Sequence, residues 1–158
     1  MTQEDKELLL KDISARLPYG VKCVVTKSRT EEGQKGDVGK IVCVCLEGVD
    51  CIDTSNFFSE FGNFKPYLFP LSSMSEEMLE ELNANGFFKY RDTIANVSHL
   101  ESKNGISEEI YTYVDIENIS FLIEYFHSHH IDYRGLIPMG LAIDATGLNI
   151  YSYGKHEI

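Results

Sequence analysis

The stretch "KIVCVCLEGVDCID", from Lys40 to Asp53, decides the class of fold. Its first seven residues are nearly all apolar and rich in β-branched side chains, which is typical of a strand inside a sheet. A turn is predicted at Glu47–Gly48, followed by a short further strand. Upstream, Val21–Lys27 predicts another strand, and the charged segment Arg29–Asp37 a loop. Consecutive strands joined in this way predict an antiparallel meander.

Helices are predicted on both sides of this meander. Residues 2–17 combine a capping Thr2 with leucines and isoleucine at helical spacing. A second helix starts after Ser73, which fits a capping box with Glu76, or after the alternative cap Ser75. A third covers about Ile116–His129 after the capping Asp115. We therefore expect an α+β fold, a single domain over residues 1–158 with an antiparallel sheet and about three helices.

The remaining segments are less regular. The phenylalanine-rich stretch Thr54–Phe64 is expected to be irregular, with its aromatic rings mostly in the core. Strands are predicted at Phe88–Val97 and Glu108–Val114, and one or two short strands near the turn at Thr146–Gly147.

The charge of the chain restricts its partners. The net charge is −11, and the segment from Pro66 to Tyr133 holds 12 acids against only Lys89, Arg91 and Lys103. Such a surface repels phosphate, so we expect no nucleic-acid binding, and any partner should be a protein with a basic surface. The simpler interpretation is a solvated acidic surface. No signal peptide or membrane span is apparent, which predicts a cytoplasmic protein without membrane association.

The four cysteines do not have the spacing of a zinc site. Cys23, Cys43, Cys45 and Cys51 lack paired C-x-x-C knuckles, and all fall in or beside predicted strands. We expect them to be buried core thiols.

The histidines of "HSHHIDYRGLIPMG" (His127–Gly140) offer the best argument for an enzyme. Glu124 and His127 have the E-x-x-H spacing of di-iron bundles, but no second copy exists. His127 and His130 are too few ligands for one ion. We interpret these histidines as helix-end residues, and expect no metal, no cofactor and no catalytic residue. No nucleophile elbow or phosphate-binding loop is present either.

Two groups of residues remain as candidate binding residues. Tyr133 and Arg134 precede Gly135, and such residues serve as binding hot spots or as structural pins; we favour the structural role for Arg134. The other group is Phe57, Phe58 and Phe61, which form either core or a contact surface.

Three segments, "LLLKDISARLPYGVK" (Leu8–Lys22), "KPYLFPLSSMSEE" (Lys65–Glu77) and "HHIDYRGLIPMGLAIDA" (His129–Ala145), carry a resemblance. In the same order they resemble segments of short uncharacterised proteins of prophages and mobile elements in gut Bacteroidales. They cover about a quarter of the chain, and the cysteine-bearing hairpin and residues 86–107 show no correspondence. The resemblance implies a bacterial or phage setting and names no catalytic residue.

We therefore expect a non-enzymatic, acidic protein-interaction module of a prophage or mobile element, for example an inhibitor of a host factor or a nucleic-acid mimic. The alternative is a small hydrolase or metal-dependent enzyme that uses the His127–His130 region or the cysteines. A deep pocket with convergent polar groups would favour the enzyme.

Overall fold

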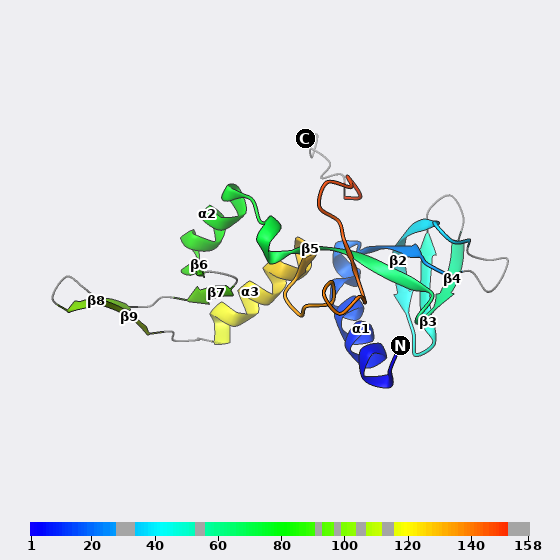
Figure 1. Cartoon of the computed structure of the whole chain (residues 1–158), viewed down its shortest axis with the longest axis horizontal. Helices are drawn as coiled ribbons and strands as arrows, with labels where there is room; N and C mark the ends of the chain where they lie inside the picture. Colours follow the sequence, from blue (N-terminus) through cyan, green and yellow to red (C-terminus); the bar gives the residue numbers. More distant parts are fainter. Residues whose placement is uncertain are drawn as a thin grey trace. The chain divides into compact units, whose positions relative to one another are not determined.

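The computed structural model describes residues 1–27, 34–52, 56–90, 93–96, 99–103, 107–111 and 116–151 (Figure 1). The chain divides into two compact units: Met1–Pro70 with His127–Ile158, and Leu71–Phe126. The single-domain organisation stays a prediction.

The first helix, α1 (Gln3–Arg16), begins where the sequence predicts it. Thr2 Oγ1 accepts a hydrogen bond from the backbone N–H of Asp5 at 3.1 Å, and the Asp5 carboxylate accepts one from the N–H of Thr2 at 3.0 Å. This reciprocal arrangement satisfies N–H groups that a helix leaves unpaired at its start. The helix passes into a 3₁₀ turn, η1 (Leu17–Tyr19), which Gly20 ends with a left-handed φ of 72°.

The sheet of the first unit contains the predicted meander. Its antiparallel strands pair in the order β5-β1-β2-β3-β4. They are β1 (Lys22–Val25), β2 (Val38–Val44), β3 (Gly48–Ile52), β4 (Asn56–Glu60) and β5 (Phe64–Pro70). Two short strands, β10 (Ile131–Asp132) and β11 (Ile143–Asp144), pair with β5 in parallel. This mostly antiparallel sheet and the three α-helices of the described residues confirm the α+β class.

The expectation of an irregular phenylalanine segment is wrong, because β4 and β5 are regular strands. In β4 the residues Phe57 and Ser59 are buried, whereas Asn56 and Glu60 are exposed and Phe58 is half-buried. This alternation is that of a strand. It is hard to see in the sequence because two adjacent aromatic residues lie on opposite faces.

The main core lies between α1 and one face of the sheet. Leu9 and Ile13 of α1 are fully buried against it. The sheet and the C-terminal loop contribute the rest: Val21, Cys23, Val25, Ile41, Val49, Cys51, Phe57, Phe64, Leu68, Leu136, Leu141 and Ala142. A smaller cluster of Val24, Tyr67 and Ala145 lies on the opposite face of β1, because Val24 alternates with Cys23 and Val25.

The second unit contains η2 (Leu71–Ser73), α2 (Glu76–Ala84) and most of α3 (Ile116–Ser128), with two hairpins. The hairpins are β6 (Phe87–Tyr90) with β7 (Thr93–Asn96), and β8 (His99–Lys103) with β9 (Ser107–Tyr111). Ser75 caps α2 by accepting a hydrogen bond from the N–H of Met78 at 3.2 Å, so the alternative cap is the one used. Phe87 and Phe121 stack with ring centroids 6.1 Å apart.

Two predictions fall in this unit. The single strand expected over Phe88–Val97 is instead part of the β6–β7 hairpin, since the chain reverses between these strands. The capping role of Asp115 falls outside the described residues.

Candidate interaction surface

Arg134, a candidate binding residue, takes part in a buried ion-pair network. Asp12 and Arg16 lie one turn apart on α1 and are both fully buried. Arg16 Nε donates to Asp12 Oδ2 at 2.7 Å, and Arg16 Nη2 donates to the carbonyl oxygen of Ile131 at 2.8 Å. Arg134 Nε lies 3.2 Å from Asp12 Oδ1, within ion-pair distance but without hydrogen-bond geometry. One buried carboxylate thus lies between two guanidinium groups.

Tyr133 adds an aromatic ring to this network. The guanidinium carbon of Arg134 lies 4.8 Å from the centroid of the Tyr133 ring, and the Tyr133 hydroxyl lies 3.0 Å from Nε2 of His127. Burial raises the pKa of Tyr133 above its ordinary value. The arrangement fits the structural role favoured for Arg134, because a buried charge needs partners of this kind. A binding role for Tyr133 and Arg134 stays a prediction.

His130 is held in a non-reactive setting. It is buried, its ring stacks on Tyr151 with centroids 4.0 Å apart, and its backbone has a left-handed φ of 56°. Burial lowers its pKa to about 3, and the positive charge of Arg16 acts in the same direction. A general base at neutral pH needs a pKa closer to 7. Among the described residues, no group of three or more His, Cys, Asp or Glu side chains is placed to hold a metal ion.

The prediction that all four cysteines are buried is wrong for Cys43 and Cys45, which are exposed. A β-bulge in β2, between Ile41 and Cys43, shifts the alternation by one residue. Cys23 and Cys51 are fully buried, with sulfur atoms 3.3 Å apart. Their hydrogen bond, together with burial, raises the pKa of Cys23, which disfavours the thiolate that a nucleophile requires.

The three candidate phenylalanines lie in three different environments. Phe57 is buried in the main core. Phe61 is half-buried beneath Lys6, whose Nζ lies 5.7 Å from the centroid of its ring. Phe58 is half-buried on the side of β4 that faces away from the main core. The structure therefore does not bring them together as one contact patch.

Phe58 belongs to a surface that we call the outer face: the side chains of β2, β3 and β4 that point away from the main core. Val42 and Ile52 on this face are 45% and 44% exposed. A concavity of about 450 Å³ is lined by Val42, Cys43, Asp50, Ile52, Asn56, Phe57 and Phe58. Exposed apolar side chains gathered on one face mark binding sites more often than scattered ones do.

The outer face has Asp50 at its centre and one open edge, and it also carries Lys40, which is exposed and lies opposite Ile52 in the β2–β3 register. Asp50 is exposed and lies directly opposite Phe58 in the β3–β4 register. No basic side chain lines the concavity. In the described part of the chain, β4 pairs only with β3, so its second edge is free of sheet partners. An edge strand presents unpaired N–H and C=O groups that a further strand can use.

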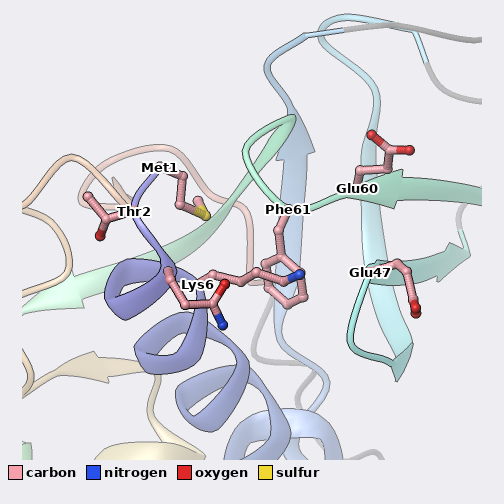
Figure 2. Close-up of a pocket in the computed structure, with 7 residues that line it drawn as sticks. Met1, Thr2, Lys6, Glu47, Glu60 and Phe61 are labelled. Atoms are coloured by element: carbon pink, nitrogen blue, oxygen red, sulfur yellow. The ribbon is translucent and has the colours of Figure 1, made fainter.

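A second concavity, of about 340 Å³, lies where the start of α1 approaches the β2–β3 and β4–β5 turns. Figure 2 shows Lys6 beside the Phe61 ring, while the carboxylates of Glu47 and Glu60 point in different directions. Small-molecule sites have polar groups that converge on one point. This concavity lacks that convergence.

No protein-family model, curated protein or solved structure matches the chain. The surface must therefore be interpreted from its own geometry. None of the helices in the described ranges combines the length and apolar character needed to cross a membrane.

Sequence reasoning named Phe58 but missed Val42, Asp50 and Ile52. The run Lys40–Leu46 is so apolar that it predicts a strand buried on both sides. Only the bulge shows that Val42 and Cys43 leave the core. The alternation in "VDCID" was a usable signal, since Asp50 and Ile52 share a face.

Proposed function

We propose that this chain is a non-enzymatic protein-interaction module of a prophage or mobile element, acting in the cytoplasm, and that it binds its partner through the outer face. The observation that carries the proposal is the exposure of Val42 and Ile52 around a concavity beside the free edge of β4. The mobile-element setting rests on the resemblance of the three segments. The first and third of these segments supply Asp12, Arg16 and Arg134 to the buried network, and none of the three contributes to the outer face.

Charge supports a partner with a basic surface. The net charge is −11, Asp50 lies in the concavity, and Glu76, Glu77, Glu80 and Glu81 of α2 are all exposed. Opposite charge raises the rate of encounter more than it prolongs the complex. The association rate should therefore fall as the salt concentration rises from about 50 to about 500 mM.

The test is selection from a displayed library of short random peptides, using the purified chain as bait. Selected peptides should bind the Val42→Ser/Ile52→Ser double variant about tenfold more weakly, since the area that these side chains bury on binding is lost. Met139→Ser/Leu148→Ser is a matched control, because these residues are 50% and 49% exposed but lie in the C-terminal loop. Equal loss in both variants, or selection of no binder, would contradict the proposal.

A further inference from the structure

We infer that the outer face binds an extended, cationic segment of its partner, which adds as a further strand beside β4. This inference rests on the proposed function and specifies the partner of the same surface. The partner segment is a strand in which positively charged and apolar side chains alternate with other residues.

The outer edge of β4 is unprotected in the described part of the chain. Proteins usually protect edge strands with lysine, proline or a covering element. The strand "NFFSE" contains neither lysine nor proline, and no described strand pairs with its outer side. Its five residues span about 17 Å, which is enough for a short partner segment. Addition of a strand to such an edge is a recurrent mode of peptide recognition.

Asp50 lies within the length of a long side chain from a strand added at this edge. Neighbouring strands lie about 4.8 Å apart, so a residue opposite Phe58 on an added strand would be about 10 Å from Asp50. The tip of the Phe58 ring lies 2.9 Å from the point where a side chain on Gly48 would begin. The ring tip therefore lies beside Gly48, at a place that a side chain at this position would occupy. A lysine or arginine opposite Phe58 can cross this ring and end at the Asp50 carboxylate, a favourable position for a cation.

The order of side chains along β4 determines the pattern expected in the partner segment. Asn56, Phe58 and Glu60 share the outer face. A partner residue opposite Glu60 is therefore best cationic, like the one opposite Phe58. A partner residue opposite Asn56 is best apolar, because Asn56 pairs with the exposed Ile52. The expected pattern is two cationic residues and one apolar residue at spacings of two.

Charge also argues against a second copy of this chain as the occupant. Pairing two β4 edges would bring together two molecules that each carry a net charge of −11. It would also bring their Glu60 and Asp50 side chains to one surface. A cationic segment has the complementary charge.

The experiment is a titration of the isotope-labelled full-length chain, followed by the NMR signals of its backbone amides. The probe is a seven-residue peptide in which lysine, arginine and leucine, in that order, alternate with threonine. We expect the largest shifts at Asn56–Glu60, and none with a peptide that has glutamate in place of the lysine and arginine. Asp50→Lys should weaken binding about fivefold or more, because an attraction becomes a repulsion. Glu7→Lys, the same reversal on α1, which covers the opposite face of the sheet, should change it less than about twofold.

Two methylated forms of the peptide test the strand itself. One carries N-methyl groups on the amides of lysine, arginine and leucine, and the other on those of threonine. Because alternate amides of a strand point to opposite edges, only one form should lose binding. Equal binding by both forms, equal effects of Asp50→Lys and Glu7→Lys, or dimerisation through β4 would overturn the inference. If other selected peptides still depend on Val42 and Ile52, the proposed function stands without it.

Discussion

The buried network around Asp12 and the outer face of β2–β4 reverse the usual distribution of charge and apolar surface. The network places Asp12 and Arg16 in the interior with no exposed surface, whereas the outer face leaves Val42 and Ile52 nearly half exposed. The difference lies in their partners. Asp12 is within ion-pair distance of two arginines, and Arg16 also reaches a backbone carbonyl. In the described part of the first unit, Val42 and Ile52 stay exposed around their concavity. A buried charge with such partners indicates framework, and an exposed apolar face indicates binding.

The largest effect is expected from breaking the network. Asp12→Ala leaves Arg16 buried without its carboxylate, which should cost about 3–5 kcal/mol of the free energy of unfolding. Urea denaturation measures this change. Glu7→Ala, an exposed acid on the same helix, is the control and should stay within about 0.5 kcal/mol of the parent chain. A loss below about 1 kcal/mol for Asp12→Ala would mean that the network is not structural.

His130 should make stability depend on pH. Its pKa is lowered from 6.5 to about 3 in the folded chain, so the unfolded chain binds a proton first as the pH falls. Stability should therefore be lost below pH 6.5, by about 1.4 kcal/mol per pH unit until the folded pKa is reached. Urea denaturation of the parent chain and of His130→Asn at several pH values isolates this contribution, since asparagine tolerates the left-handed backbone. Parallel pH profiles of the two chains would refute it.

Substitution of Arg134 distinguishes a structural role of this residue from a binding role. Arg134→Ala should lower stability by about 1–3 kcal/mol, because Asp12 loses one of its two cationic partners. Thermal and urea unfolding measure the loss, and peptide binding should be unchanged. An unchanged melting temperature together with lost binding would instead identify Arg134 as a recognition residue.

Substitutions on the outer face should have the opposite effects: stability is kept and peptide binding is lost. Val42→Ser/Ile52→Ser should change stability by no more than about 0.5 kcal/mol per site, since both side chains are exposed. The same variant should lose peptide binding. Large destabilisation would show that these side chains belong to the framework.

No effect is expected from removing metal ions. Treatment with a chelator should leave the melting temperature unchanged, and elemental analysis should find less than about 0.1 zinc or iron per chain. The reason is that, among the residues the structure describes, His127, His130 and the cysteines belong to no group of three or more potential ligands. A content near one metal per chain would reopen the enzyme alternative.

Sequence reasoning predicted the local elements well and the surfaces poorly. The Thr2 cap, the first three strands and α2 with its alternative cap Ser75 are present in the structure. Each depends on residues close together in the chain, through capping hydrogen bonds or apolar periodicity. The exposure of Cys43 and the strand nature of Asn56–Glu60 were missed, because a bulge and a pair of adjacent aromatic residues hide the alternation.

The sequence by itself determined the α+β class, the positions of the helices and the meander, since short-range patterns specify these. Only the tertiary structure decided which side of β2 faces the core, because α1 covers one face of the sheet and Val42 lies exposed on the other. It also decided that Arg16 meets Ile131, which is 115 residues away in the chain. It likewise decided that β10 and β11 pair in parallel with β5. Contacts of this kind depend on how the chain returns to the sheet, and no local pattern records them.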